Sequence, residues 1–238
     1  MDLHEFARLA HIAVGTVVLA SFWGAAWAPK GSLPHRRFGR VYVLAMVALL
    51  AATLVLATGS VLAGDPRRAV FNVYVSLISV ASVWMAWSSI SHRDNFARYR
   101  GWPYKLICLA LGGYGMFLLT LVPKMGIPAR MAMVSAFAVL GLSIAGVMAW
   151  RLVRGADHTR WWLSEHLTAM SINFAATHAS FSILALSTIW PALKDPWTRT
   201  AILVAWMISA LVVRLWAGRR FLRGARQPVR AVGAPATS

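Results

Sequence analysis

The stretch EHLTAMSINFAATHASFS, residues 165–182, places Glu165, His166 and His178 in an otherwise apolar segment. Imidazole and carboxylate groups can transfer protons, ligate a metal or hold haem iron. Each is costly to bury in hydrocarbon without a partner, so an ionisable residue inside a membrane span is a candidate functional residue. The polar residues of this stretch fall on two faces of a helix, which predicts that the helix is buried among other helices.

The two histidines of this stretch cannot ligate one metal, because the twelve residues between them correspond to about 18 Å of helix. His11, in the first apolar segment, is a better partner for His178, since both fall at a similar depth when their segments are centred in a bilayer. Gly15 follows His11 by one turn and leaves room for a flat cofactor. The first hypothesis is therefore that His11 and His178 are axial ligands of haem b iron, and the alternative is interhelical hydrogen bonding.

The segment KGSLPHRRFGRVY contains a compact group of cations and one further histidine, His35. Its Arg36, Arg37 and Arg40 are suited to hold haem propionates, a quinone edge or anionic lipid headgroups. The same charges also fit a simpler role, which is to set the orientation of the chain in the membrane.

A zinc site is the second chemical hypothesis. His35 and His166 would be ligands, and Glu165 would be the general base of an intramembrane hydrolase. No HExxH motif and no cysteine pair is present to nominate zinc by its spacing. A third hypothesis is a non-enzymatic sensor or transporter whose buried histidines respond to pH.

The elements that must position these residues are membrane-spanning helices. Of the 238 residues, 59% are hydrophobic and only 13% are charged, whereas about a quarter are charged in soluble domains. The single cysteine, Cys108, excludes an intramolecular disulfide and a cysteine metal cluster. The sequence predicts an all-α, polytopic membrane helix bundle with seven spans. These are residues 8–27, 41–63, 69–90, 105–122, 131–150, 163–190 and 199–217.

The distribution of the 24 Lys and Arg residues predicts the orientation of the bundle. Most of them follow the first, third and fifth spans or lie in the tail, which places the amino terminus outside and the carboxyl terminus in the cytoplasm. The net charge of +17 is then explained by contact with anionic lipid headgroups, and we expect no nucleic-acid partner. Residues 1–222 are predicted to form one transmembrane domain, followed by a disordered basic tail over 223–238.

Three of these segments together resemble a family of bacterial multi-pass membrane proteins of uncharacterised function. The resemblance implies a bacterial inner-membrane location and the same fold class, and it points to the four histidines, but it implies no established activity. It covers the first two spans and the sixth. The matching residues are His11 and Gly15; Lys30, Gly31, His35, Arg36, Gly39, Arg40 and Tyr42; and Glu165, His166, Met170, His178 and Phe181.

The preferred prediction from the sequence is a membrane redox protein that binds haem b and passes electrons between a quinol-like donor and an acceptor. His11 and His178 would ligate the iron, and Arg36, Arg37 and Arg40 would hold the propionates or lipid headgroups. His35 and His166 would be further ligands or proton carriers near the cytoplasmic side. The zinc-dependent hydrolase and the pH-responsive sensor or transporter are the alternatives.

Overall fold

A computed structural model describes residues 3–124, 126, 128–156, 159–190 and 195–222, and these residues contain helices and no strand. The predicted tail over 223–238 lies outside the described residues. Seven helices are long, and two short helical segments lie in the connections. The elements are α1 (Leu3–Trp27), α2 (Leu33–Leu62), α3 (Pro66–Ser91), α4 (Phe96–Tyr99), α5 (Trp102–Leu121), the 3₁₀ turn η1 (Val122–Lys124), α6 (Pro128–Arg154), α7 (Trp161–Ile189) and α8 (Pro196–Phe221).

The prediction of an all-α membrane helix bundle is confirmed. Among the described residues, six helices are long and apolar enough to cross a membrane, namely α1, α2, α3, α5, α6 and α8. The seventh long helix, α7, has 29 residues and carries the polar residues from which the chemical hypotheses start. The predicted second span begins too late, because the helix starts at Leu33 and includes the basic residues that follow.

Three of the long helices begin with the same local signal, a side-chain cap followed by proline in the first turn. Ser32, Asp65 and Asp195 accept hydrogen bonds from the backbone N–H three residues later. Proline in the first turn needs no intrahelical N–H partner, so its ring starts a helix without cost. These caps explain why the loop sequences rich in proline and charge separate the spans so sharply.

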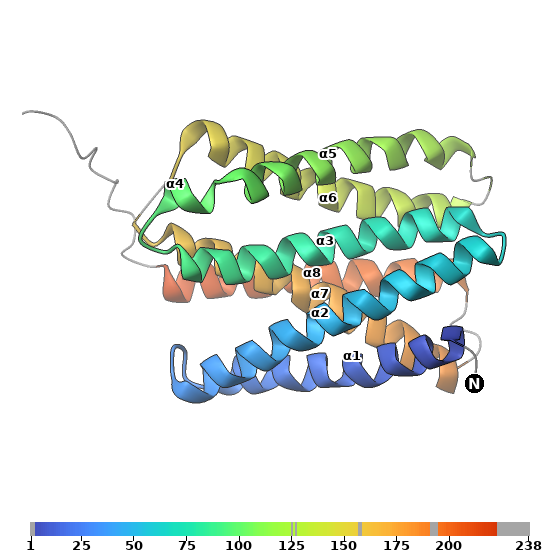
Figure 1. The fold of residues 1–238 in the computed structure, drawn as a ribbon, viewed down its shortest axis with the longest axis horizontal. Helices are drawn as coiled ribbons and strands as arrows, with labels where there is room; N and C mark the ends of the chain where they lie inside the picture. The colour runs from blue at the N-terminus through green and yellow to red at the C-terminus, as the bar shows by residue number, and fades with distance from the viewer. Residues whose placement is uncertain (1–2, 125, 127, 157–158, 191–194, 223–238) are drawn as a thin grey trace, which may run out of the picture.

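The helices α3 and α7 lie in the middle of the bundle, which Figure 1 shows as an antiparallel array. The α1–α2 hairpin packs on one flank through contacts with α3 and α7, and the α5–α6 hairpin packs on the other through α3. The last helix, α8, lies against α7 and touches α6. This arrangement confirms that α7 is an interior helix, although it shares the centre with α3.

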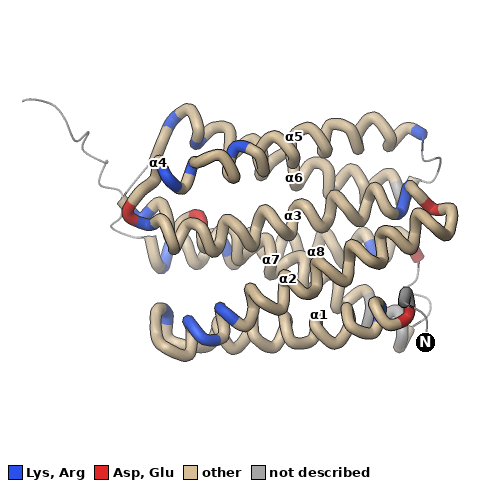
Figure 2. The backbone as a smooth tube through the Cα atoms, viewed as in Figure 1, with Lys and Arg blue, Asp and Glu red and all other residues tan. Residues whose placement is uncertain are grey.

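One end of the bundle carries most of the described Lys and Arg residues, as Figure 2 shows. We call this the basic end. It contains the end of α1, the start of α2, α4 with its flanking residues, the start of α5, the end of α6, the start of α7 and the end of α8. Its described cations are Lys30, Arg36, Arg37, Arg40, Arg93, Arg98, Arg100, Lys105, Arg151, Arg154, Arg160, Arg219 and Arg220.

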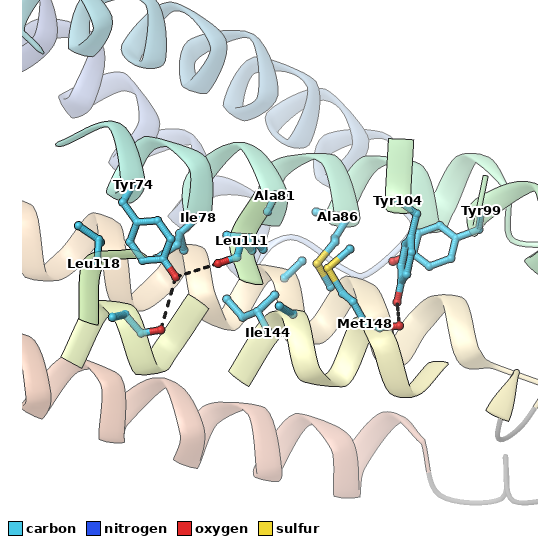
Figure 3. Packing of buried hydrophobic residues seen from close by; sticks show 14 of the residues in the cluster. Tyr74, Ile78, Ala81, Ala86, Tyr99, Tyr104, Leu111, Leu118, Ile144 and Met148 are labelled. Atoms are coloured by element: carbon cyan, nitrogen blue, oxygen red, sulfur yellow. Dashed lines mark hydrogen bonds between the residues drawn. The ribbon is translucent and has the colours of Figure 1, made fainter. Parts of the chain in front are cut away.

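The largest apolar core joins α3, α5, α6 and α7, and tyrosine hydroxyls in it bond to helix carbonyls (Figure 3). The Tyr74 hydroxyl lies 3.3 Å from the Leu111 carbonyl oxygen and 3.4 Å from that of Ala138. It reaches this position because Gly141 has no side chain: an added Cβ would lie 2.7 Å from Tyr74 Cζ. Small residues thus allow close helix packing where no hydrophobic effect drives association.

Polar contacts join α7 to α3 near the middle of the helices. Ser82 Oγ donates to Asn173 Oδ1 at 3.0 Å, and Asn173 Nδ2 donates to the Ala169 carbonyl oxygen at 3.0 Å. Asn173 is 1% exposed, so its amide is kept from lipid. The expectation that the polar residues of α7 face other helices is confirmed for Asn173.

Candidate functional site

The Glu165 carboxylate lies at the basic end, within the bundle, and has two strong partners. Arg151 Nε, from the end of α6, lies 2.9 Å from Glu165 Oε1. Tyr99 Oη, from α4, donates to Glu165 Oε2 at 2.9 Å. Burial and the charge of Glu165 raise the pKa of Tyr99, so the phenol remains a donor. We call Tyr99, Arg151 and Glu165 the ion-pair site.

Local sequence explains how α4 brings Tyr99 to this place. The Asn95 side chain accepts a hydrogen bond of 2.9 Å from the Arg98 backbone N–H and so starts the short helix. The Tyr99 ring then packs against Trp161, with ring centroids 4.9 Å apart. Arg100 Nη1 donates to the carbonyl oxygens of Arg151 and Leu152 at 2.9 and 3.0 Å. These carbonyls lie in the last turn of α6, where a cation is favoured by the helix dipole.

The predicted role of Glu165 as a general base has no geometric support here. Its two carboxylate oxygens are already engaged, one by the Arg151 guanidinium and one by the Tyr99 phenol. No group of three or more His, Cys, Asp or Glu side chains in the described part of the chain could hold a metal. The zinc-dependent hydrolase therefore stays a prediction.

The two histidines of that hypothesis, His35 and His166, come together at the basic end. His35 Nδ1 lies 2.9 Å from the Ala25 carbonyl oxygen, at the end of α1. His166 Nδ1 lies 3.1 Å from the Ala86 carbonyl oxygen in α3. His166 lies within electrostatic range of His35 and Lys30. The structure thus places two imidazoles near each other, each anchored by one nitrogen to a backbone carbonyl.

Lys30 also belongs to this group, and its side chain caps the carboxyl-terminal end of α1. Its ammonium group donates to the carbonyl oxygens of Ala25 and Ala26, which are the unpaired acceptors of the last helical turn. Partial burial lowers the pKa of Lys30. His35, at the start of α2, contacts the same Ala25 carbonyl oxygen as Lys30. This one acceptor therefore links the end of α1 to the start of α2.

The three arginines assigned to propionates or headgroups are exposed at the start of α2. Arg36, Arg37 and Arg40 are outward-facing, and the structure gives them no ion pair with a described carboxylate. Their position suits contact with lipid headgroups. Their roles toward haem propionates or a quinone stay predictions.

The two proposed haem ligands have different surroundings. His11 faces α2, where its Nδ1 lies 3.2 Å from Thr53 Oγ1. Gly15, expected to admit a flat cofactor, lies beside Leu49, and an added Cβ would be at an ordinary contact distance of 3.7 Å from that side chain. His11 is therefore a contact between α1 and α2 in this structure.

His178 instead contacts α1 at another residue and has both ring nitrogens engaged. Trp23 Nε1–H donates to His178 Nε2 at 2.9 Å. His178 Nδ1 lies 2.8 Å from the Phe174 carbonyl oxygen, so Nδ1 carries the proton and Nε2 is the acceptor. This arrangement gives no support to ligation of haem iron by His11 and His178, and the pairing stays a prediction that an absorption spectrum tests.

Aromatic rings surround His178 on three helices. The ring centroids of Phe174 and Trp206 lie 4.4 and 4.8 Å from the imidazole centroid. Those of Trp23 and Phe22, both on α1, lie at 5.6 and 5.7 Å. We call His178 with Phe22, Trp23, Phe174 and Trp206 the histidine site. The exposed fraction of His178 is 7%, so lipid has little access to it.

Sequence reasoning missed three residues that the structure brings into these sites, Trp23, Tyr99 and Arg151, and it gave no role to Arg214 on α8. Arg151 and Tyr99 were hidden among the interfacial residues of the basic end. Arg214 had a usable signal, because it is an arginine inside the apolar run of α8. Its Nε donates to Thr168 Oγ1 at 2.8 Å and its Nη2 donates to Ser164 Oγ at 2.8 Å.

Comparisons with known proteins add nothing to this picture, and the resemblance to a bacterial membrane-protein family stays a prediction. No family model, no curated protein and no solved structure matches this chain.

Proposed function

We propose that the protein is a non-enzymatic membrane protein of the sensor or transporter type, in which protonation of His178 changes the contact between α1 and α7. The observation that carries this proposal is the hydrogen bond of 2.9 Å from Trp23 Nε1–H to His178 Nε2. An imidazole accepts a hydrogen bond only through an unprotonated nitrogen. The contact therefore requires neutral His178.

Protonation has a defined consequence because the other ring nitrogen is already a donor. Nδ1 bonds to the Phe174 carbonyl oxygen, so a second proton must bind at Nε2. The imidazolium N–H would then point at the indole N–H, and the hydrogen bond between the two helices would be lost. The same side chain cannot rotate to restore the bond without giving up its bond to Phe174.

Protonation of His178 acts directly on the side chains that pack against its ring. The side chains that face it from α1 and α8 are the aromatic residues Phe22, Trp23 and Trp206. Its two ring nitrogens contact the Trp23 indole N–H and the Phe174 carbonyl oxygen. The α1 helix packs chiefly on α2 and makes a smaller contact with α7, in which the Trp23–His178 hydrogen bond is accompanied by the packing of Phe22 on Phe174.

Distance measurements between spin labels test this proposal. Val17 on α1 and Phe181 on α7 are exposed and are replaced by labelled cysteines in a Cys108→Ser background, in lipid nanodiscs. We expect the distance distribution to change when the pH is lowered from about 8 to well below the ordinary imidazole value of about 6.5. With His178→Gln, whose amide oxygen can accept from Trp23, the distribution should stay at its high-pH form.

The control is His92→Gln, at the end of α3, which should leave the pH response intact. The His92 ring bonds to Ser88 within its own helix. The proposal is wrong if the label distance does not change with pH, or if it changes equally in His178→Gln.

A further inference from the structure

Three arginines in the first turns of α2 share one outward face of the helix, at the basic end that Figure 2 shows. The opposite face of α2 is fixed against α1. The Tyr42 ring is 2% exposed and packs on Phe22, and His35 Nδ1 lies 2.9 Å from a carbonyl oxygen at the end of α1. The outward side chains are therefore presented by a helix whose rotation is set by its contacts with α1. We call them the arginine face, which consists of Arg36, Arg37 and Arg40.

Several other arginines at the basic end already have partners within the chain. Some pair with a carboxylate, and others lie over an aromatic ring. The first kind are Arg93 and Arg151, and the second kind are Arg100, Arg154 and Arg220. The side chains of the arginine face make no hydrogen bond, ion pair or ring contact within the described part of the chain. Their charge is therefore not neutralised by the described residues.

The spacing of the arginine face brings its like charges together. Arg40 follows Arg36 by four residues and Arg37 by three, and side chains at these spacings are neighbours on a helix surface. Like charges at such spacings destabilise the helix, so an anion bound between them is favoured. A guanidinium group holds a phosphate through two parallel hydrogen bonds. Orientation in the membrane does not require this clustering, because it depends on the number of cations in a connection and not on a shared helix face.

The same outward face becomes apolar one turn further along α2. Val41, Leu44 and Val47 are 44%, 71% and 58% exposed. Leu44 follows Arg40 by four residues, which is about 6 Å along the helix. The exposed face of α2 thus changes from cationic to apolar from the basic end toward the middle of the bundle. A phospholipid in the membrane changes in the same direction, from its phosphate to its acyl chains.

We propose that the arginine face binds the headgroup of an anionic phospholipid, whose acyl chains lie along Val41, Leu44 and Val47. The phosphate oxygens accept hydrogen bonds from the guanidinium groups. Free phosphate or an acidic protein would match the arginines, but neither would cover the apolar surface that continues from them. This proposal is independent of the response of His178 to protons.

Native mass spectrometry of the full chain in a neutral detergent tests the proposal. The ligands are phosphatidylglycerol and phosphatidylcholine with the same acyl chains, so that only the headgroup differs. Each basic residue near an anionic lipid contributes about a five-fold factor in affinity, and we therefore expect the wild type to prefer phosphatidylglycerol by about one hundred-fold. Each single change of these arginines to glutamine should reduce the preference about five-fold, and the triple change should abolish it.

A matched control removes three cations from the neighbouring connection at the same end of the bundle. The triple variant Arg93→Gln, Arg98→Gln and Lys105→Gln should keep the preference for phosphatidylglycerol.

A charge-preserving variant separates lipid binding from membrane insertion. Changing all three residues of the arginine face to lysine keeps the charges that orient the chain, and it should retain most of the preference. Some affinity should be lost, because lysine cannot hold a phosphate through two parallel hydrogen bonds. If the triple glutamine variant fails to insert, the three single variants measure the same effect one charge at a time.

Three results would overturn the assignment. One is an equal loss of preference in the two triple glutamine variants, which would show that only the total charge matters. Another is displacement of phosphatidylglycerol by glycerol phosphate at a similar concentration, which would identify a free phosphate as the occupant. The third is displacement by a polyglutamate peptide at lower concentration than by phosphatidylglycerol itself, which would identify an acidic protein.

Discussion

Arg151 and Glu165 form an ion pair of 2.9 Å within the helix bundle, with side chains 11% and 2% exposed. The two residues come from consecutive helices, α6 and α7, and the pair joins the end of one to the start of the other. Buried charges of this kind contribute little net stability as a pair, but each one is costly when its partner is removed.

Glu165→Gln should therefore lower the free energy of unfolding by about 3–5 kcal/mol, because it leaves the Arg151 charge buried and uncompensated. Thermal unfolding of the detergent-solubilised chain measures the change. Arg154→Gln, at an exposed position of the same helix end, should change stability little. The double variant Arg151→Met with Glu165→Gln should cost less than the sum of the single changes. A Glu165→Gln variant as stable as the wild type would contradict this prediction.

Tyr99→Phe removes one hydrogen bond to the same carboxylate and should lower stability by about 1–3 kcal/mol near neutral pH. The pKa of Tyr99 is raised in the folded chain, by burial and by Glu165. The folded state then holds this proton more tightly than the unfolded state, so the stabilisation is present below about pH 10 and is lost as the pH rises further.

The measurement for Tyr99 is unfolding as a function of pH for both chains. The stability difference between wild type and Tyr99→Phe should shrink as the pH rises above about 10, the ordinary value for a phenol. If the stability difference stays constant across this range, the pKa of Tyr99 is not raised in the folded chain.

Gly141→Ala should lower stability by about 1–3 kcal/mol through overpacking, because the new methyl group would collide with the Tyr74 ring and hydroxyl. Gly146→Ala is the matched control on the same helix, since an added Cβ there meets no atom within 4 Å. That control should be neutral or slightly stabilising, as alanine favours a helix. Tyr74→Phe in the Gly141→Ala background should recover part of the loss. Equal stability of the two glycine variants would refute the close contact.

Lys30 should be acylated at lower pH than a lysine in an unfolded peptide, because its lowered pKa increases the neutral amine fraction at a given pH. Mass spectrometry after brief treatment with acetic anhydride across a pH series measures the modified fraction. Denaturing the protein before labelling is the control and should restore ordinary behaviour. If the Lys30 profile is the same before and after denaturation, the end of α1 does not perturb this amine.

The amino-acid sequence by itself determined the fold class, the number of long helices and most of their ends. These properties are local: apolar runs of membrane-spanning length define the helices, and caps with first-turn prolines such as Asp65–Pro66 define where they begin. The burial of α7 was also predictable, because Asn173 and His178 need partners that lipid does not supply.

Only the tertiary structure decided which residues meet. The haem hypothesis required α1 and α7 to be neighbours, which the sequence left open. They are in contact, but the residue that reaches His178 is Trp23 and not His11. Arg151 looked like an interfacial charge until α4, α6 and α7 placed it against Glu165 beside Tyr99. Partner choice depends on the rotation, tilt and offset of each helix against its neighbours. Rotation, tilt and offset are set by packing over the whole bundle, so the residues of one helix do not determine them.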